Sequence, residues 1–287
     1  MSIAPVLLRE YPAMNDAQRS IVSHDAGPLL VIAGPGSGKT FSLVLRAMNL
    51  LLLERVLPRE LVICTFTEKA AFELRDRMYA AARKVGYDKD LSELRVSTIH
   101  GMCNRLLTTY RHHTPLGNNY ETLDELTQLL FVFDNFDAIV GPQVGDRFLG
   151  KWKTKWTAIE GVRGYFDKIT EELVDPDALC SSSDTLLQAI GTAYKAYRKS
   201  LLENNRLDFA HQQKLVHDLL LIPDLYRRIA DGVKYVMVDE YQDTNYIQEQ
   251  IILRLTQDRR NLCVVGDEDQ SLYRFRGATV RNILEFP

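Results

Sequence analysis

Short apolar runs alternate with helical patterns at both ends of the chain. The apolar runs are rich in β-branched residues and short enough to be strands, and they occupy residues 29–33, 61–66, 94–99, 233–239 and 262–266. The helical patterns occupy residues 39–54, 68–85, 100–110 and 246–256. Near-continuous apolar strands that alternate with helices are typical of a parallel sheet covered on both faces. The pattern therefore predicts an α/β fold in which a central parallel sheet is flanked by helices.

Residues 107–206 follow a different pattern. They contain few strand-like runs and several amphipathic helical patterns, such as those over residues 123–136 and 185–202. This region holds 11 Lys and Arg against 14 Asp and Glu, which leaves 24 of each kind elsewhere, so it carries the whole formal charge of −3. We therefore predict an all-α subdomain, residues 107–206, inserted into an α/β domain formed by residues 1–106 and 207–287.

Composition limits the class of protein. The chain has 287 residues, of which 46% are hydrophobic and 25% are charged, close to the average for globular proteins. These values exclude a disordered, collagenous or coiled-coil chain. Because 35 Lys and Arg stand against 38 Asp and Glu, there is no overall basic excess, and any binding of nucleic acid must come from a local surface.

The apolar stretches and the cysteines indicate in which cellular compartment the protein is expected. The longest apolar stretches are far shorter than the roughly 18 residues of a membrane span, and the N-terminus lacks the pattern of a secretory signal. The four cysteines, at positions 64, 103, 180 and 263, form no C-x-x-C motif. We therefore expect a reduced, cytoplasmic protein with no membrane partner. A metal site formed by Cys103 with His112 and His113 is the alternative use of these residues.

A glycine-rich segment joins the first predicted strand to the first long helix. Its sequence is Ala33-Gly34-Pro35-Gly36-Ser37-Gly38-Lys39-Thr40. Glycines let backbone N–H groups approach phosphates, and the helix N-terminus adds positive potential. In such a Walker A phosphate loop, Lys39 would pair with the β- and γ-phosphates and the Thr40 hydroxyl would bind Mg²⁺. The alternative, a glycine-rich turn that binds nothing, is disfavoured by the Gly-Lys-Thr at the start of the helix.

Two acidic residues follow the fourth apolar run. Asp239 and Glu240 come directly after Val236-Met237-Val238. A carboxylate at such a strand end can hold Mg²⁺, and its neighbour can orient and deprotonate an attacking water. Alone, two acids after a strand more often mark a solvated strand end. In a chain that also has a phosphate loop, they predict Asp239 as a Mg²⁺ ligand and Glu240 as the catalytic base.

Further motif-like segments occur in order along the chain around these two motifs. They are Asn15-Asp16-Ala17-Gln18, Thr65-Phe66-Thr67-Glu68-Lys69-Ala70-Ala71, Ser97-Thr98-Ile99-His100, Asp239-Glu240-Tyr241-Gln242-Asp243-Thr244-Asn245, and residues 266–278 (GDEDQSLYRFRGA). This set closely resembles the UvrD/Rep/PcrA group of superfamily 1 DNA helicases. The resemblance begins at Met14 and is weakest over residues 141–206. It implies a RecA-like P-loop domain that hydrolyses ATP with Mg²⁺ and moves 3′-to-5′ on single-stranded DNA or at single/double-strand junctions.

The resemblance also implies roles for individual residues. Gln18 would hydrogen-bond the adenine, Gln270 would contact the γ-phosphate, and Gln242 would help to place that phosphate or its water. The residues that would contact the DNA strand are Thr65, Phe66, Thr98, His100, Tyr273, Phe275 and Arg276. Single strands are held by stacking on aromatic rings, at roughly 1–3 kcal/mol per base, and by neutralisation of the backbone. For Phe66 and Phe275, ordinary core packing is the alternative.

Several positions depart from the family pattern. Phe41 stands in the ATP-binding segment where the family often has an arginine that stacks on adenine. The remaining departures are Phe275 for Trp, Glu68 for Asn, Ile99 for Phe, and His211 for an acid after the segment Leu207-Asp208-Phe209. An aromatic ring at position 41 could still stack on a base, without the arginine that stacks on adenine in the family.

The family's second RecA-like domain is expected as a partner. In the family that domain begins near the position that corresponds to the end of this chain, and it supplies arginines to the γ-phosphate. An arginine finger contributes on the order of 10³–10⁵ in rate. We therefore expect this chain to be a helicase fragment that binds ATP weakly and hydrolyses it poorly.

One segment of the insertion combines aromatic and basic residues. Its sequence is Lys151-Trp152-Lys153-Thr154-Lys155-Trp156. Aromatic rings interleaved with lysines could clamp DNA. Equally, the two tryptophans are four residues apart, so they could pack inward from one helix face while the lysines remain solvated.

Three other functions stay open at this point. The chain could belong to a nucleic-acid-binding regulator in which ATP acts as a switch without unwinding, or to the helicase module of a larger nuclease–helicase. It could also be a P-loop kinase that acts on a small molecule. The segment from Gln270 to Arg276 argues against a kinase, because it places a phosphate-facing amide six residues from a possible base-stacking platform.

Overall fold

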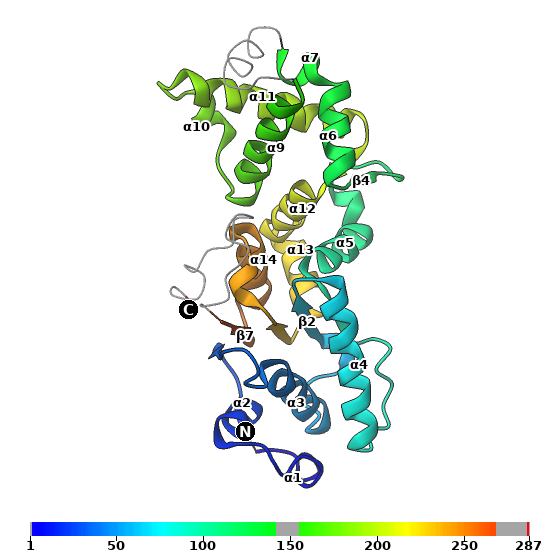
Figure 1. Cartoon of the computed structure of the whole chain (residues 1–287). Helices are drawn as coiled ribbons and strands as arrows, with labels where there is room; N and C mark the ends of the chain where they lie inside the picture. Colours follow the sequence, from blue (N-terminus) through cyan, green and yellow to red (C-terminus); the bar gives the residue numbers. More distant parts are fainter. Residues whose placement is uncertain (1, 142–154, 268–285, 287) are drawn as a thin grey trace. The chain divides into compact units, whose positions relative to one another are not determined.

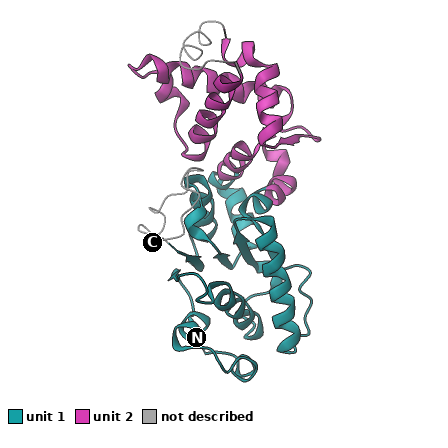
Figure 2. Cartoon of the chain, viewed as in Figure 1, with its two compact units in different colours: residues 1–103, 219–287 teal, residues 104–218 magenta. Residues whose placement is uncertain are grey.

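The computed structural model of the chain describes residues 2–141, 155–267 and 286 (Figure 1). The chain divides into two compact units (Figure 2). Unit 1 comprises residues 1–103 and 219–287, and unit 2 comprises residues 104–218. None of the helices in the described ranges is long and apolar enough to cross a membrane.

Unit 1 is built on a five-stranded parallel sheet with the strand order β1-β7-β6-β2-β3. The strands are β1 (Leu29–Ile32), β2 (Leu61–Thr65), β3 (Arg95–Thr98), β6 (Tyr235–Val238) and β7 (Leu262–Gly266). Alternate side chains of the central strands point to opposite faces, and both sets are buried. On one face, Ile63 and Met237 belong to a core cluster. On the opposite face, their neighbours Val62 and Val236 are also buried. This confirms the predicted central parallel sheet, covered on both faces.

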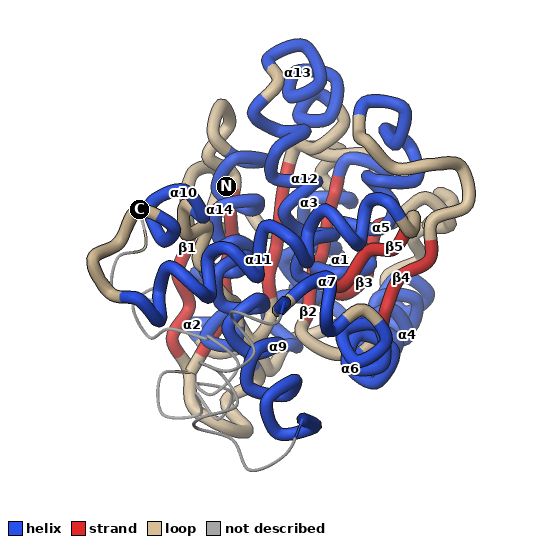
Figure 3. Tube along the Cα trace, turned by 90° about the horizontal axis from the view of Figure 1, so that it is seen from above, coloured by secondary structure: helices blue, strands red, loops and turns tan. Residues whose placement is uncertain are grey.

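The helices of unit 1 are distinguished from the strands by colour in Figure 3. They are α1 (Pro5–Glu10), α2 (Asp16–Ser23), α3 (Lys39–Leu52), α4 (Glu68–Lys84), α13 (Pro223–Asp231) and α14 (Tyr246–Thr256), with the 3₁₀ turns η1 (Pro58–Glu60) and η3 (Tyr241–Asp243). Every residue of α3 from Ser42 to Leu51 is buried. Helix α4 packs on α3 and β3, and α14 packs on β6 and α13. The helix that follows the phosphate loop is therefore the centre of the core of unit 1.

Unit 2 is mostly helical. Its helices are α6 (Glu125–Asp134), α7 (Phe136–Ile139), α9 (Lys155–Glu171), α10 (Pro176–Cys180) and α11 (Thr185–Glu203), with the 3₁₀ turn η2 (Arg111–His113). Buried side chains of α6, α7, α9 and α11 form its core, in which the rings of Phe166 and Tyr197 stack with their centroids 4.6 Å apart. The prediction of an all-α insertion needs one addition. Strands β4 (Glu121–Leu123) and β5 (Arg206–Asp208) pair in parallel as a small second sheet.

Two helices cross the boundaries between the units. Helix α5 (Ile99–Tyr110) contains the first boundary, and α12 (Phe209–Leu221) contains the second. The second boundary lies at residue 218, whereas the sequence prediction placed it at residue 206. The difference arises because β5 pairs with β4 and because Asp208 and His211 hydrogen-bond within unit 2.

The tryptophan-containing segment of unit 2 lies only partly in the described ranges, because residues 151–154 are outside them. Helix α9 begins at Lys155, and the ring of Trp156 lies 6.1 Å from the ring of Phe133 on α6. Trp156 remains 38% exposed. Both interpretations of this segment, DNA contact and inward packing, therefore stay predictions.

Candidate functional site

The phosphate loop lies between the end of β1 and the start of α3. Gly36 and Gly38 have φ angles of +72° and +87°, in the left-handed region that favours glycine. A side chain at position 38 would also come within 3.0 Å of the amide nitrogen of Gln18. Gly38 is the N-cap of α3, and no side chain in the described part of the chain caps this helix end. The first N–H groups of α3 are therefore available to an anion.

The rest of the loop is held at its two ends and exposed between them. The N–H of Ala33 donates to the carbonyl of Gly266 at 3.1 Å, which extends the pairing of β1 with β7. The hydroxyl of Ser37 donates to the carbonyl of Gly34 at 2.7 Å. Residues 34–37, Pro35 among them, are exposed. The loop is thus anchored on the sheet, and its glycine-rich part is open to a ligand.

Lys39 brings a buried cation to this loop. Its Nζ atom lies 3.6 Å from Oδ2 of Asp267 and 4.0 Å from Oε2 of Glu240. Although the side chain is only 10% exposed, Nζ has no hydrogen-bond partner in the described part of the protein. A buried ammonium group with unused donors is costly unless a ligand completes its shell. Phosphate oxygens of a nucleotide would provide the missing acceptors.

Thr40 and Asp239 meet as the two predicted Mg²⁺ ligands. The Thr40 hydroxyl donates to Oδ2 of Asp239 at 3.1 Å. Burial, together with the nearby charge of Glu240, raises the pKa of Asp239 above its ordinary value. A cation at this position would offset both effects, and a hydroxyl with a carboxylate are oxygen ligands of the kind that Mg²⁺ prefers. The chemistry of these donors therefore fits the ion.

The described residues form no cluster of the side chains that most often bind metal ions. Within residues 2–141, 155–267 and 286, no group of three or more His, Cys, Asp or Glu side chains is arranged to hold a metal ion. Cys103, the cysteine of the alternative metal site, is fully buried, and burial raises the pKa of its thiol far above the ordinary value. A thiol that resists ionisation is a poor metal ligand.

Glu240 lies at a strained turn and is held by Gln242. Its φ and ψ angles are 54° and 46°, a left-handed conformation that is uncommon for a residue other than glycine. The amide nitrogen of Gln242 donates to Oε2 of Glu240 at 2.7 Å, and the amide oxygen of Gln242 accepts from the N–H of Asp267 at 3.0 Å. Gln242, which was predicted to place the γ-phosphate or its water, thus connects the ends of β6 and β7 through Glu240.

Two acids of this site were not singled out from the sequence. Asp267 follows β7 and is the nearer carboxylate to Lys39. Asp243 lies in η3, and burial together with the charge of Glu240 raises its pKa to about 6. Its Oδ1 atom is buried and has no hydrogen-bond partner in the described part of the protein. Both acids occur in segments that carried the family resemblance, so the sequence did contain a signal for them.

Gln18 and Phe41 flank the phosphate loop. Gln18 and Asn15 form a capping box at the start of α2, and the amide nitrogen of Gln18 also lies 3.5 Å from the carbonyl of Ser37. The ring of Phe41 packs on the core of unit 1 and lies edge-on to the ring of Tyr11, with centroids 5.7 Å apart. The structure thus brings Gln18 to the loop, while Phe41 makes its ring contact with Tyr11.

Four of the predicted strand-contacting residues lie in the described ranges, at or just after the ends of β2 and β3, the other half of the same sheet edge. Thr65 and Thr98 are register partners, but their side chains are buried, at 2% and 5% exposure. The Thr98 hydroxyl donates to Oε1 of Glu68 at 2.8 Å and accepts from the N–H of Gly101. Neither threonine side chain presents its hydroxyl on the surface in this structure.

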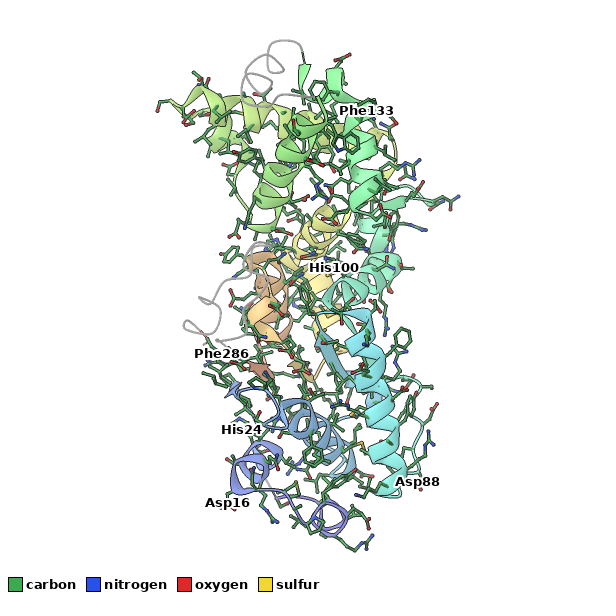
Figure 4. All side chains as sticks on the ribbon, in the orientation of Figure 1. Asp16, His24, Asp88, His100, Phe133 and Phe286 are labelled. Carbon is green, nitrogen blue, oxygen red and sulfur yellow. The ribbon has the colours of Figure 1, made fainter. Side chains whose placement is uncertain are left out.

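Phe66 and His100 are the more accessible members of this group. Phe66 follows β2 and is partly exposed. His100, labelled in Figure 4, lies in the first turn of α5. Burial lowers the pKa of His100 to about 4, against an opposing effect of Glu68. At neutral pH the imidazole is therefore uncharged, and it can act through hydrogen bonds or stacking rather than as a cation.

Comparison with known proteins assigns the chain to a family. The family model for the UvrD/REP helicase N-terminal domain matches residues 14–287. The chain belongs to this family. The match covers the phosphate loop, Gln18 and the acidic strand ends, and it confirms the resemblance inferred from the sequence.

Individual relatives cover almost the whole chain. It is 33% identical to the ATP-dependent DNA helicase PcrA of Bacillus subtilis (strain 168) over 282 residues, which are 95% of this chain and 35% of that protein. The same identity, over 289 residues and 35% of the relative, is found with the ATP-dependent DNA helicase UvrD1 of Mycobacterium tuberculosis (strain H37Rv). PcrA of Staphylococcus aureus (strain COL) is 33% identical over 275 residues. The chain thus spans about a third of the length of these curated relatives.

Four predicted site residues of this UvrD/REP family domain lie outside the described residues. They are Gln270, Tyr273, Phe275 and Arg276. Their roles toward the γ-phosphate and the DNA strand stay predictions. Asp267, the last described residue before them, hydrogen-bonds Gln242 through its N–H.

Proposed function

We propose that this chain is the first ATP-binding lobe of an ATP-dependent DNA helicase that moves along single-stranded DNA. One observation carries the proposal: three strand ends bring Lys39 and Thr40 together with Asp239, Glu240 and Asp267. In open α/β sheets, ligands bind beyond the carboxyl ends of the strands. The names of the relatives, ATP-dependent DNA helicases, support both the nucleotide and the reaction.

Each residue of the site has its own proposed role in the binding or hydrolysis of ATP. The loop N–H groups and Lys39 would bind the phosphates, and Gln18 would contact the adenine. Thr40 and Asp239 would hold Mg²⁺, which neutralises phosphate charge when bound. Glu240 would accept a proton from the attacking water, and the hydrogen bond from Gln242 would keep its carboxylate in place.

The DNA strand is proposed to cross the ends of β2 and β3. Phe66, Tyr273 and Phe275 would stack on its bases, and the neutral His100 and Arg276 would reach its phosphates or bases. Thr65 and Thr98 would contribute after a local rearrangement, because both are buried. Movement in the 3′-to-5′ direction follows from the family resemblance alone.

A second RecA-like domain is proposed to complete the motor. The relatives are much longer than this chain, which spans 35% of the length of B. subtilis PcrA. Arginines from a facing domain would stabilise the charge that develops on the γ-phosphate, an effect on the order of 10³–10⁵ in rate. The chain on its own is therefore expected to bind ATP and to turn it over slowly.

The test is ATP hydrolysis by the enzyme that contains this domain, measured with and without single-stranded DNA. We expect DNA to raise the rate of the wild type. Glu240→Gln should lower the stimulated rate by about 10²–10⁴, the range for loss of a general base, while ATP binding is retained. A wild-type rate that DNA leaves unchanged, or a Glu240→Gln variant as fast as the wild type, would contradict the proposal.

A strand-displacement assay separates this proposal from its rivals. A helicase separates a duplex next to a single-stranded tail while it hydrolyses ATP. A regulator that uses ATP only as a switch would hydrolyse it without separating strands. A small-molecule kinase would transfer phosphate to an acceptor and would not respond to DNA.

A further inference from the structure

Two polar side chains are enclosed in the core of unit 1, away from the phosphate-binding residues. Arg46 and Asn49 lie one turn apart on α3 and are 1% and 0% exposed. Arg46 is among the largest side chains that the structure buries completely. Burying a guanidinium or an amide is unfavourable unless its hydrogen bonds are satisfied. The partners of these two groups therefore indicate what they are for.

Both side chains bind the C-terminal end of α2. Nη1 of Arg46 donates to the carbonyl of Ile21 at 2.9 Å and to that of His24 at 2.6 Å. Nδ2 of Asn49 donates to the carbonyl of Val22 at 3.0 Å. The last carbonyls of a helix have no partner within the helix, and a cation there also interacts favourably with the helix dipole. Helix α3 thus caps α2 with its own buried side chains.

Asn49 also fixes the segment that precedes α1. Its Oδ1 accepts from the N–H of Ala4 at 2.8 Å, and its Nδ2 lies 3.2 Å from the carbonyl of Ser2. One buried amide therefore joins three parts of the chain: the N-terminal segment, the end of α2 and the helix that follows the phosphate loop. This arrangement leaves α2 little freedom to shift along α3.

The opposite end of α2 meets the phosphate loop. Gln18 lies in the first turn of α2, and its amide nitrogen faces Ser37 and Gly38 of the loop. Figure 4 labels Asp16 and His24, which lie at the two ends of this helix. A helix of eight residues is only about 12 Å long at 1.5 Å per residue, so fixing one end also fixes the other. The buried contacts of Arg46 and Asn49 therefore determine where the amide of Gln18 lies.

We propose that Arg46 and Asn49 are positioning residues for recognition of the nucleotide base, acting through α2 and Gln18. The inference rests on the proposed binding of ATP at the phosphate loop. It divides the site into two parts. The loop, Lys39 and Thr40 bind the triphosphate, whereas the α2–α3 contact sets the geometry for the adenine. Loss of the contact should therefore weaken binding of ATP and leave binding of a triphosphate without a base nearly unchanged.

The experiment compares dissociation constants for ATP and for inorganic tripolyphosphate, both with Mg²⁺, by calorimetric titration of the full chain. Arg46→Met keeps the length of the side chain and removes its donors. We expect it to weaken ATP binding by about tenfold, the equivalent of about one lost hydrogen bond, and to change tripolyphosphate binding less than twofold. Arg46→Lys retains a donor and a charge, and should recover most of the ATP affinity.

Two further variants distinguish the proposed effect on ATP binding from a general loss of stability. Asn49→Ala removes one of the three hydrogen bonds to α2, whereas Arg46→Met removes two, so it should weaken ATP binding by a smaller factor. Met48→Ala opens a cavity in the same buried helix without removing a hydrogen bond to α2, so it serves as the matched control. It should lower the melting temperature and leave the ratio of the two dissociation constants as in the wild type.

A double-mutant cycle with Gln18→Ala identifies the route. If Arg46 acts through Gln18, Arg46→Met should cause no further loss of ATP affinity in the Gln18→Ala background. Additive losses would overturn the inference, as would a wild-type ratio of the two dissociation constants in Arg46→Met. A wild type that binds neither ligand would contradict the proposed function itself. If the wild type binds ATP and tripolyphosphate equally tightly, the base is not recognised and this inference is wrong, while the proposed phosphate site still holds.

Discussion

Each unit of the molecule encloses a cluster of acidic side chains, and the two clusters differ in how far the hydrogen bonds of their carboxylates are satisfied. In unit 2, Asp208 accepts from the hydroxyl of Tyr197 at 2.6 Å and from the N–H of His211 at 2.7 Å. The ring Nδ1 of His211 lies 2.9 Å from the same carboxylate. Burial alone would raise the pKa of Asp208, but His211 and these hydrogen bonds hold it below the ordinary value. The Asp208 carboxylate is therefore fully satisfied, although Nε2 of His211 is buried without a hydrogen-bond partner in the described part of the protein.

The cluster in unit 1 is incomplete. Nζ of Lys39 and Oδ1 of Asp243 are buried without hydrogen-bond partners in the described part of the protein. Burial and the charge of Glu240 raise the pKa values of Asp239 and Asp243. Several buried charged groups without partners, gathered in one place and with raised pKa values, indicate a site that a ligand completes, whereas a satisfied carboxylate stabilises the fold. The comparison of the charged groups therefore assigns a binding role to the unit 1 cluster and a structural role to Asp208 in unit 2.

Lys39→Ala should have the largest effect on function. Because the ammonium group is the buried cation nearest to the acidic strand ends, its loss should lower DNA-stimulated ATP hydrolysis by about 10³-fold, or about 4 kcal/mol. The free energy of unfolding should change by no more than about 1 kcal/mol, because the cost of burying the ammonium group offsets its two long ion pairs, at 3.6 and 4.0 Å. Turnover and urea unfolding measure the two effects. A variant that unfolds far more easily while it hydrolyses ATP normally would reverse the assignment of the two clusters.

Asp208→Ala should show the opposite behaviour. It leaves Tyr197 and His211 without their buried acceptor, at a cost of about 3 kcal/mol in the free energy of unfolding. ATP binding by the folded protein should remain as in the wild type. Urea unfolding and calorimetric titration test this, with the exposed Asp224→Ala as a control that should be near neutral. Loss of ATP affinity in a folded Asp208→Ala protein would mean that the unit 2 cluster is not merely structural.

Gln242→Leu should have an intermediate effect confined to turnover. The substitution removes both hydrogen bonds that join Glu240 to the N–H of Asp267. A less firmly held base should lower kcat by about tenfold, or about 1.4 kcal/mol, with little change in the dissociation constant for ATP. Steady-state kinetics and titration separate the two quantities. A tenfold loss of ATP affinity with an unchanged kcat would instead favour direct contact of Gln242 with the phosphates.

Asp243→Asn should have the smallest effect, and it should be stabilising. The folded-state pKa of Asp243 is raised to about 6, so the folded protein binds this proton more tightly than the unfolded chain does. The ionised carboxylate therefore destabilises the fold above about pH 6, and this effect disappears as the pH falls toward 4. The neutral amide should add about 1 kcal/mol at pH 7 and nothing at pH 4, measured by unfolding at both values. A gain that is independent of pH would contradict the assigned pKa.

Local sequence patterns predicted most of the main sheet and its helices. Strand β7 and helix α14 occupy the predicted residues, because each is an uninterrupted apolar run or periodic segment with clear ends. The small sheet in unit 2 was not predicted. Its strands have three residues each and pair Glu121 with Arg206, far apart in the sequence. No local pattern carries information about such a pairing.

The candidate site likewise has residues that the sequence predicted and contacts that it did not. Lys39 and Thr40 were predicted because they end a glycine-rich loop at the start of a helix, and Asp239 and Glu240 because they directly follow an apolar strand. The partners of Gln242 could not be predicted, because they depend on the turn at Glu240 and on the position of β7. Arg46 reads in the sequence as one charged residue in an apolar helix, and only the fold shows that it reaches the end of α2.

The central claim is that a triphosphate and Mg²⁺ occupy the site formed by Lys39, Thr40, Asp239 and Glu240. A crystal structure of the protein with Mg²⁺ and a non-hydrolysable ATP analogue tests it most directly. The account predicts phosphates enclosed by residues 33–40, with the β- and γ-phosphates at Nζ of Lys39 and the metal at the Thr40 hydroxyl. An analogue bound elsewhere, with Lys39 still beside Asp267, would contradict it.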